Sequence, residues 1–308
     1  MRFIKPKFWD LKKPNFFALA LFPFSILFNF FSLFNLKKKI KREKILTICV
    51  GNIYIGGTGK TSLAIALKKA LEKEGKKVCF IKKFYNNQID EQKLLIQNGK
   101  TFIEKKRVDS LDKAISHGYE IAIFDDGLQD SSIDYNQKLV CFNKLNWIGN
   151  GLIIPSGPLR ENIKSLRKYN NIFLNGNDEK IDNIINEIKN ISEDINIFEA
   201  KYEPTNLEKF DESEKYLAFS GIGNHQTFVN MLKNNKLKVI KDIEFPDHYN
   251  YRVEDIDQII SKSKALGTKI ITTEKDFVKL DKSKKDQINY IKIDLVVQDL
   301  NRIIKKLI

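Results

Sequence analysis

Short apolar runs alternate along the chain with longer stretches whose apolar positions follow a helical period. The short runs predict strands and the longer stretches predict helices. The predicted strands cover 45–50, 78–82, 121–124, 138–142, 171–174, 216–219, 237–243, 269–272 and 289–293. The predicted helices cover 60–74, 109–117, 158–168, 179–191, 225–234, 253–265 and 297–307. This alternation predicts an α/β fold with a mostly parallel sheet and helices on both faces.

The same pattern divides the chain into four parts. Residues 1–44 form an apolar segment with basic flanks, and 45–175 carry the first series of strands and helices. The stretch 176–215 is rich in Asn and charged residues, which is typical of a linker between two halves. Residues 216–308 then form a second, smaller α/β half.

The amino-terminal run 16–36 contains no charge and eight phenylalanines. Its length could just span a bilayer, but Pro23 interrupts the helix, Asn29 and Asn35 are costly in hydrocarbon, and lysines flank both ends. A helix lying in the membrane interface therefore fits best. A spanning helix, a buried core helix and a removed signal peptide remain alternatives.

The net charge of +14 allows a nucleic-acid or anionic-membrane partner, although a lysine-rich genome composition would give the same balance. The phenylalanines concentrate in the uncharged run instead of interleaving with basic residues, which favours lipid over nucleic acid. The chain has only three scattered cysteines, Cys49, Cys79 and Cys141. They exclude a disulfide framework and predict buried, reduced thiols in a cytosolic body.

A glycine-rich segment lies between the first predicted strand and the helix at 60–74. It consists of Gly56, Gly57, Thr58, Gly59, Lys60, Thr61 and Ser62. Glycines let backbone N–H groups turn toward phosphate oxygens, and the helix N-terminus adds its positive dipole. Lys60 would reach the β- and γ-phosphates, and Thr61 would bind Mg²⁺. The pattern departs from the strict phosphate loop at Tyr54, where glycine is expected.

An acidic pair, Asp125 and Asp126, follows the apolar strand at 121–124 and precedes Gly127. An acid at the end of a buried strand is the arrangement that holds Mg²⁺ beside a phosphate loop. Alone the pair would indicate a turn, but after the glycine-rich segment it predicts a nucleotide site.

Six motifs, which include the glycine-rich segment and the acidic pair, occur in an order that resembles the tetraacyldisaccharide 4′-kinases, the lipid A 4′-kinases of Gram-negative bacteria. They are VGNIYIGGTGKTS at 50–62, DDGLQ at 125–129, IPSGPLRE at 154–161, FSGIGN at 219–224, FPDHYNY at 245–251 and ITTEKD at 271–276. KPKFW at 5–9 and the apolar run behind it are similar to the family's amino-terminal anchor. The resemblance extends from about Lys5 to Asp276.

The resemblance implies a kinase that uses ATP and Mg²⁺ to phosphorylate the 4′-hydroxyl of a lipid A disaccharide 1-phosphate. It implies binding to the inner membrane through residues 5–44 as a peripheral or monotopic protein, with the body in the cytoplasm. We also expect a monomer without nucleic-acid partners. The roles carried over make Asp90 the base and His248 its partner, with Lys60 and Asp126 also catalytic. Arg160 and Glu161 would contact substrate, and the metal would be held by Thr61, Asp125, Glu91 and Gln129.

From the residues alone, several of these positions have other interpretations. Asp90 and Glu91 also fit a solvated helix start, and Arg160 fits either a surface residue or an anion clamp. Lys275 fits a nucleotide contact or an exposed turn.

The chain also departs from the family pattern near the expected base. The second strand continues as Lys82-Lys83-Phe84-Tyr85 instead of a Ser-Arg-Gly-Tyr-Gly-like stretch, and Asp130 replaces a His after DDGLQ. Ile89 and Gln92 stand where Gly and Pro are expected beside the acidic pair. These differences affect the alignment of the base and do not remove the phosphate loop.

Two other classes of function share part of the pattern. A membrane-tethered nucleotide switch of the partitioning or cell-division type would need a Lys before the paired glycines, where this chain has Ile55. A nucleic-acid-binding ATPase would fit the net charge but not the distribution of aromatic residues. The lipid kinase is therefore the leading hypothesis.

Overall fold

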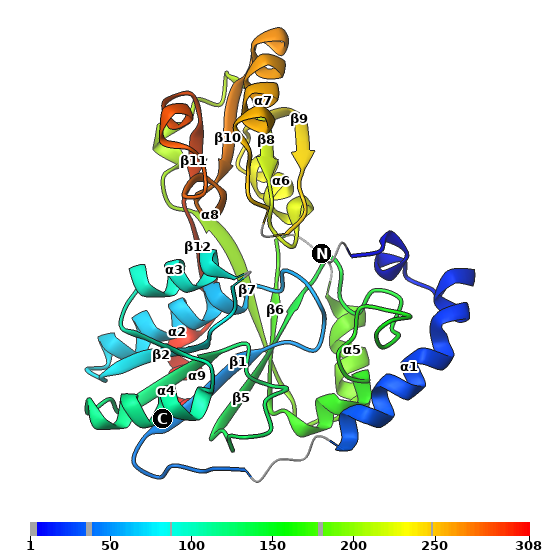
Figure 1. The fold of residues 1–308 in the computed structure, drawn as a ribbon, viewed down its shortest axis with the longest axis vertical. Coiled ribbons are helices and arrows are strands. Elements are labelled where there is room, and N and C mark those ends of the chain that lie inside the picture. The colour runs from blue at the N-terminus through cyan, green and yellow to red at the C-terminus, as the bar shows by residue number, and fades with distance from the viewer. Residues whose placement is uncertain (1–4, 35–38, 87, 178–180, 248) are drawn as a thin grey trace. The chain divides into compact units, whose positions relative to one another are not determined.

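A computed structural model describes residues 5–34, 39–86, 88–177, 181–247 and 249–308 (Figure 1). The chain forms two compact units. Unit 1 consists of Met1–Ala200 together with Val297–Ile308, and unit 2 consists of Lys201–Val296. The chain leaves unit 1 within β7 and returns to it at the end of β12.

An eight-stranded sheet organises unit 1, in the order β12-β7-β6-β5-β1-β4-β2-β3. All neighbouring strands from β3 to β7 are parallel. The strands are β1 Leu46–Gly51, β2 Val78–Lys83, β3 Thr101–Glu104, β4 Ile121–Asp125, β5 Gln137–Asn143, β6 Asn171–Asn175, β7 Asn196–Pro204 and β12 Ile293–Val297. The carboxyl ends of the parallel strands therefore meet at one edge, which is where ligands bind in such sheets.

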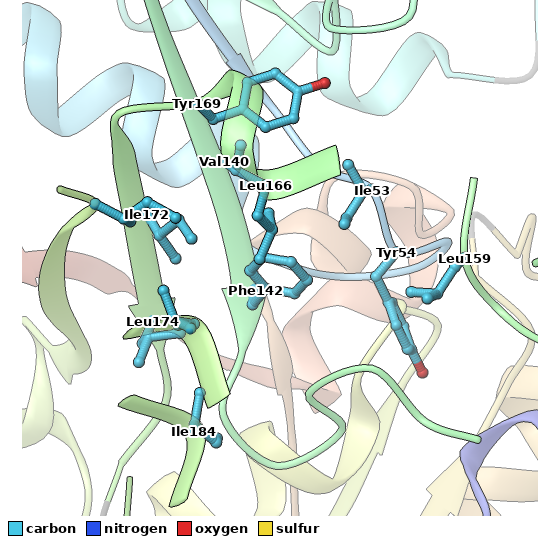
Figure 2. Packing of buried hydrophobic residues seen from close by; sticks show 12 residues of the cluster. Ile53, Tyr54, Val140, Phe142, Leu159, Leu166, Tyr169, Ile172, Leu174 and Ile184 are labelled. Atoms are coloured by element: carbon cyan, nitrogen blue, oxygen red, sulfur yellow. The ribbon is translucent and has the colours of Figure 1, made fainter. Parts of the chain in front are cut away.

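Helices cover both faces of this sheet, because side chains on each strand alternate between two apolar layers. The helices are α2 Lys60–Lys73, α3 Ile89–Gln97, α4 Arg107–Ser116, α5 Asp182–Ile191 and α9 Leu300–Leu307. The helix α4 buries Leu111 against one face, and α5 buries Ile184 and Ile188 against the same face farther along. Figure 2 shows Ile184 among the residues of the second cluster. On the other face α2 packs over β1, β2 and β4, and α9 packs against α2.

Unit 2 repeats the design with four parallel strands in the order β11-β10-β8-β9. Its elements are β8 Lys215–Ser220, α6 His225–Asn234, β9 Lys238–Glu244, α7 Val253–Leu266, β10 Lys269–Thr273, α8 Glu274–Phe277 and β11 Asn289–Ile291. The helices α6 and α7 bury their apolar sides in separate clusters on the two faces. The predicted α/β class, with mostly parallel strands and helices on both faces, is confirmed.

The element boundaries differ from the sequence-based expectation in several places. The strands β3 and β7 and the helix α3 lie where none was predicted. The expected helix at 158–168 does not form, because this segment is a loop followed by the 3₁₀ turn Ile163–Lys168. The other 3₁₀ turns among the described residues are Lys7–Asp10, Leu207–Lys209 and Lys282–Gln287. The expected linker 176–215 contains α5 and β7, which complete the first sheet.

The expected second half, 216–308, also needs correction at its end. The last twelve residues, 297–308, belong to unit 1. Three apolar side chains of α9, Ile303, Ile304 and Leu307, are buried, and α9 packs against α2. Burial of this face explains why the chain returns to the first unit.

The amino-terminal helix α1, Phe16–Phe34, lies at the side of unit 1 (Figure 1) and buries few of its side chains. Ala18 and Ser25 are buried, whereas Phe16 and Phe24 are 79% and 59% exposed. Ser25 Oγ donates to the carbonyl oxygen of Ile153 at 2.8 Å. In the described parts of the chain, no helix is long and apolar enough to cross a membrane.

Candidate active site

The phosphate loop joins the carboxyl end of β1 to the first turn of α2. Gly56 and Gly59 have φ angles of 127° and 81°, which residues with a Cβ atom rarely adopt. The helix begins at Lys60, directly after this turn. Asn52 braces the loop from inside, since its Nδ2 donates to the carbonyl oxygen of Tyr54 and, at 2.9 Å, to Thr58 Oγ1. The loop can therefore present backbone N–H groups and a helix N-terminus to a phosphate.

Tyr54, the departure from the strict loop pattern, is part of the core. Its side chain is 2% exposed and packs in the apolar cluster with Leu159 and Phe142 (Figure 2). Its hydroxyl donates to Asp10 Oδ1 at 2.5 Å. The ring therefore anchors the loop to the apolar cluster and to the amino-terminal segment.

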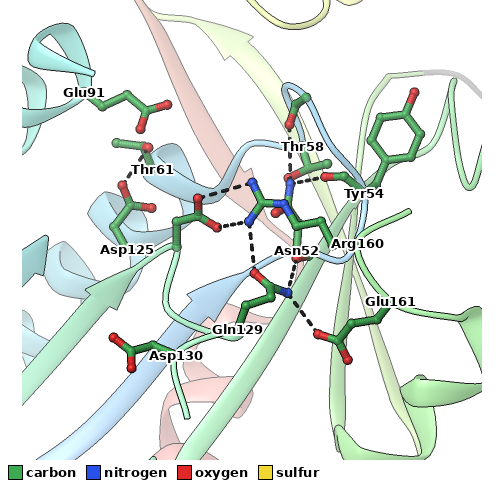
Figure 3. A network of polar contacts seen from close by, with 12 residues as sticks. Asn52, Tyr54, Thr58, Thr61, Glu91, Asp125, Gln129, Asp130, Arg160 and Glu161 are labelled. Atoms are coloured by element: carbon green, nitrogen blue, oxygen red, sulfur yellow. Dashed lines mark hydrogen bonds and ion pairs between the residues drawn. The ribbon is translucent and has the colours of Figure 1, made fainter. Parts of the chain in front are cut away.

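Three polar side chains meet where β2 and β4 end. They are Lys82 from β2, Asp125 from β4 and Thr61 from the first turn of α2. The strands β2 and β4 are parallel neighbours, and Lys82 and Asp125 are paired in register. Lys82 Nζ lies 2.7 Å from Asp125 Oδ2 and 2.5 Å from Glu91 Oε2. Thr61 Oγ1 donates to the same Asp125 Oδ2 at 3.1 Å (Figure 3).

Lys82 is 1% exposed and Asp125 is fully buried. Burial alone lowers the pKa of Lys82, but the carboxylates of Asp125 and Glu91 outweigh it and raise that pKa above its ordinary value. The structure therefore places Asp125 beside the phosphate loop and adds the ammonium group of Lys82, which the sequence motif does not contain.

These residues fit a divalent cation of the Mg²⁺ type. Asp125 Oδ1 is buried and has no hydrogen-bond partner among the described residues. A buried carboxylate oxygen without a donor, next to the Thr61 hydroxyl, is a suitable ligand for a hard cation. The described residues contain no group of three or more His, Cys, Asp or Glu side chains placed to hold a metal. Such a site suits Mg²⁺, which takes most of its ligands from phosphates and water.

Asp126 and Arg160 form the next ion pair along the edge. Arg160 Nη1 lies 2.8 Å from Asp126 Oδ1, and Nη2 lies 3.4 Å from Oδ2. Burial raises the pKa of Asp126, but Lys60 and Arg160 reverse this effect and hold the pKa well below its usual range. Arg160 is 26% exposed, so the guanidinium is held in place and still accessible to an anion.

Gln129 links this pair to Glu161 (Figure 3). Its Oε1 accepts from Arg160 Nη1 at 3.0 Å, and its Nε2 donates to Glu161 Oε1 at 3.0 Å and to the carbonyl oxygen of Asn52 at 3.1 Å. The amide thus orients both residues that were expected to contact substrate. Its contact in this structure is with Arg160, whereas the resemblance assigned it to the metal.

Arg107 supports the turn that carries Asp126. Asp126 has a φ of 58°, and its carbonyl oxygen accepts from Arg107 Nη2. Arg107 Nη1 also lies 3.0 Å from Asp130 Oδ2. Asp130, which replaces the expected His, is therefore the partner of a buried arginine at this turn.

The expected base lies on α3. Asp90 belongs to the first turn of that helix, and its side chain lies outside what the structure describes. Glu91, the next residue, reaches Lys82 at the edge of the sheet. His248 also lies outside the described residues.

Two motifs of unit 2, FSGIGN and ITTEKD, meet at Asp276. This residue is fully buried, and its carboxylate accepts from the Gly221 N–H at 3.1 Å and from Thr273 Oγ1 at 2.8 Å. Lys275 Nζ lies 3.8 Å from Asp247 Oδ1, and this pair links the ITTEKD motif to the FPDHYNY motif. The FSGIGN, FPDHYNY and ITTEKD motifs are thus joined at one edge of the second sheet.

Sequence reasoning did not identify Lys82, Arg107 or Asn52 as parts of the site. Lys82 could have been found, because it lies on the same face of a buried strand as the apolar residues Val78 and Phe80. A lysine at such a position needs an anionic partner. Arg107 carried no comparable signal, since it comes from a helix start.

The chain is similar to proteins of one family over nearly its whole length. The model of the family described as LpxK, tetraacyldisaccharide-1-P 4′-kinase, matches residues 17–308. The tetraacyldisaccharide 4′-kinase of Pelagibacter ubique is 56% identical over 308 residues, covering 100% of this chain and 98% of the relative. The enzyme of the same name from Rickettsia akari is 32% identical and covers 91% of this chain and 90% of the relative.

Among solved structures, a crystal structure of LpxK from Aquifex aeolicus in complex with ATP resembles the chain with a TM-score of 0.65. The two share 22% sequence identity, and the match covers 94% of this chain and 97% of that one. This likeness supports the fold. Because the family model and the sequence relatives cover nearly the whole chain, the protein belongs to the tetraacyldisaccharide-1-P 4′-kinase family.

Proposed function

We propose that the protein transfers the γ-phosphate of ATP to the 4′-hydroxyl of a tetraacyldisaccharide 1-phosphate, a step of lipid A biosynthesis. The observation that carries this function is the phosphate loop whose Thr61 faces Asp125, in a chain of this family. The family assignment supports the kinase and not the membrane-tethered nucleotide switch. Phosphoryl transfer requires positioning, charge neutralisation and a group that accepts the hydroxyl proton.

The nucleotide phosphates are held by the loop. The residues are Gly56, Gly57, Thr58, Gly59, Lys60, Thr61 and Ser62. The first turn of α2 supplies backbone donors, and Lys60 places a positive charge near Asp126. Mg²⁺, bound by Thr61 and Asp125 with Glu91 and Gln129 as further proposed ligands, would neutralise charge on the phosphates.

Arg160 and Glu161 are proposed to contact the acceptor or the transferring group. The guanidinium of Arg160 is fixed on Asp126 and Gln129, and a side chain held in this way loses little freedom when it meets an anion. Glu161 is held by Gln129 and by the Tyr169 hydroxyl at 3.2 Å. Both therefore have defined orientations before the substrate arrives.

Asp90 is the proposed base, with His248 as its partner. Its place on the first turn of α3 is next to Glu91, whose carboxylate reaches the Lys82 ammonium at the sheet edge. A carboxylate oriented by an imidazole can accept the proton of a sugar hydroxyl. The role of this pair rests on the family resemblance.

The membrane surface is the proposed location of the substrate and of α1. The helix exposes phenylalanines and leucines along most of its circumference, while lysines before and after it can meet anionic head groups. We propose a monomer that binds the inner membrane peripherally through residues 5–44, with both α/β units in the cytoplasm.

Phosphate transfer from labelled ATP to a tetraacyldisaccharide 1-phosphate in detergent micelles tests the function directly. The wild type should form the 1,4′-bisphosphate, and Asp90→Ala should lower the rate by at least about a hundredfold. Asp112→Ala is the matched control, because that exposed carboxylate pairs with Arg42 on the surface and should leave the rate unchanged. A folded wild type that binds ATP without transfer would overturn the kinase, and full activity of Asp90→Ala would overturn the base.

A further inference from the structure

Lys82 is a buried cation in contact with the carboxylate that a metal would use. Its Nζ lies 2.7 Å from Asp125 Oδ2, and Thr61 Oγ1 lies 3.1 Å from the same oxygen. Register pairing between β2 and β4 places the two residues opposite each other. The contact is therefore built into the sheet and does not depend on a flexible loop.

The same ammonium group also contacts Glu91 at 2.5 Å. Lys82 is 1% exposed and Glu91 side-chain exposure is 16%, so water screens this cluster poorly. Two carboxylates converge on one ammonium, which leaves one net negative charge in the cluster. Without the ammonium group, the two carboxylates would form a site of two negative charges beside Thr61, with oxygen donors that divalent cations prefer.

We infer that Lys82 is a resident counter-cation that occupies the Asp125–Glu91 carboxylate pair and keeps a divalent cation from loading there before the nucleotide arrives. The phosphates of a nucleotide add the negative charge and the oxygen ligands that this cluster lacks while Lys82 is in place. Binding of metal is thereby coupled to binding of nucleotide. The inference rests on the proposed function only in taking Asp125 as the metal-binding carboxylate.

A second consequence concerns α3. Glu91 is in the first turn of this helix, and the Glu91–Lys82–Asp125 chain connects that turn to the sheet edge. Lys82 is thus a positioning residue for the segment that carries Asp90. Its role differs from that of Lys60, which starts the helix after the phosphate loop.

The test measures Mn²⁺ binding to the full chain without nucleotide or acceptor, by the electron paramagnetic resonance of free Mn²⁺. Wild type should bind weakly, and Lys82→Met should bind about tenfold more tightly or better, because the competing charge is gone. Lys82→Arg keeps the charge and should stay close to wild type. An unchanged or weaker Mn²⁺ affinity in a folded Lys82→Met protein would overturn the inference.

A second pair of variants guards against loss of folding, since Lys82→Met leaves two carboxylates facing each other. Glu91→Gln removes one of them, and Lys82→Met in that background should again raise Mn²⁺ affinity by about tenfold. Equal affinities of Glu91→Gln and the double variant would contradict the proposal. Lys68→Met is the matched control, because Lys68 is also a buried lysine, paired with Glu72 at 2.6 Å on α2. Its Mn²⁺ binding should equal that of wild type.

The readout separates this inference from the proposed function. No phosphate is transferred in the binding measurement, so its result does not depend on which acceptor the protein phosphorylates. A wild type that transfers phosphate while Lys82→Met shows no gain in Mn²⁺ affinity would remove the counter-cation and leave the kinase. A gain in Mn²⁺ affinity in Lys82→Met, together with a wild type that transfers no phosphate, would support the counter-cation and overturn the kinase.

Discussion

At the scale of single residues, Arg160 carries a positive charge and is also held in a defined orientation by its neighbours. One nitrogen of its guanidinium contacts both Asp126 and Gln129, and a second reaches the other Asp126 oxygen. A lysine has one donor atom and would keep the charge without this fixed fork. The geometry therefore predicts that charge alone at position 160 is insufficient.

Arg160→Met should lower kcat/KM of the transfer reaction by about a hundredfold, which is typical for loss of one preorganised charged donor. Arg160→Lys should recover only part of this loss. Arg252→Lys serves as the control, since Arg252 pairs with Asp255 on the exposed side of α7 and should not affect the rate. Steady-state kinetics with both substrates measures the effect, and full activity of Arg160→Lys would show that the fork is not used.

Single residues also show where sequence reasoning reaches its limit. We predicted that Thr61 and Asp125 meet, because Thr61 lies after the first predicted strand and Asp125 directly follows the predicted strand at 121–124. The structure brings them within hydrogen-bond distance. Tyr54 was interpreted as a departure of the loop, but its ring belongs to the core. Its partner Asp10 is 44 residues away in sequence, and no local pattern predicts such a contact.

At the scale of elements, the turn after β4 shows how a buried ion pair can fix the position of a site residue. Its conformation places Asp126 at a positive φ, and Arg107 from the start of α4 bonds to its carbonyl oxygen and to Asp130. Arg107 is 5% exposed, so loss of its carboxylate partner would leave a buried charge unpaired. The pair of Arg107 and Asp130 therefore stabilises the turn that carries Asp126.

Asp130→Asn should lower the free energy of unfolding by about 3 kcal/mol. Asp112→Asn, at the exposed pair with Arg42, should cost about 0.5 kcal/mol or less. Burial raises the pKa of Asp130, but hydrogen bonds from Ser132 and the charge of Arg107 lower it below 3.8 overall. Its stabilisation is therefore complete above pH 3.8 and is lost as the pH falls through the folded-state pKa.

Denaturant unfolding at several pH values measures both effects. The difference between wild type and Asp130→Asn should be largest at neutral pH and shrink as the pH falls below 3.8, the ordinary value. A difference that stays constant over this range, or that grows in acid, would show that the ionised pair does not support the turn.

Elements with long apolar runs were predictable, and those held mainly by tertiary contacts were not. The strand β7 alternates few apolar residues and is mostly half-buried, so its sequence is similar to that of a linker. The segment before Arg160 has no regular element, but backbone bonds fix it to the phosphate loop, from Ile55 N to Pro158 O and from Arg160 N to Ile53 O. Such pairing between distant segments explains why a helix predicted at 158–168 does not form.

At the scale of the whole molecule, hydrogen bonds link the amino-terminal region to the segment that precedes Arg160 in unit 1. Trp9 Nε1 donates to the carbonyl oxygen of Pro155 at 3.0 Å, and Ser25 Oγ contacts Ile153 and Ser156. This segment continues directly to Arg160 in the chain. The amino-terminal region is therefore fixed to the loop that carries a substrate-binding candidate, and a membrane that holds α1 would place that loop near its surface.

The two sides of α1 should be separable by mutation. Phe24 and Phe28 are 59% and 43% exposed, and neither is needed for the buried stripe formed by Ala18 and Ser25. Each phenylalanine that enters the acyl region contributes up to about 2 kcal/mol. The double variant Phe24→Ser, Phe28→Ser should therefore bind vesicles containing phosphatidylglycerol at least about tenfold more weakly, with unchanged nucleotide affinity.

Vesicle sedimentation and a fluorescent ATP analogue measure these two quantities on the same preparations. Ile240→Ser is the matched control, because Ile240 is 49% exposed on β9 in unit 2 and should affect neither. Higher salt should weaken binding further, since lysines flank α1 on both sides and their attraction to anionic lipid is screened. If the phenylalanine variant still binds vesicles as tightly as wild type, the membrane surface lies elsewhere on the protein, and the contact of α1 with the Ile153–Ser156 segment serves only to stabilise unit 1.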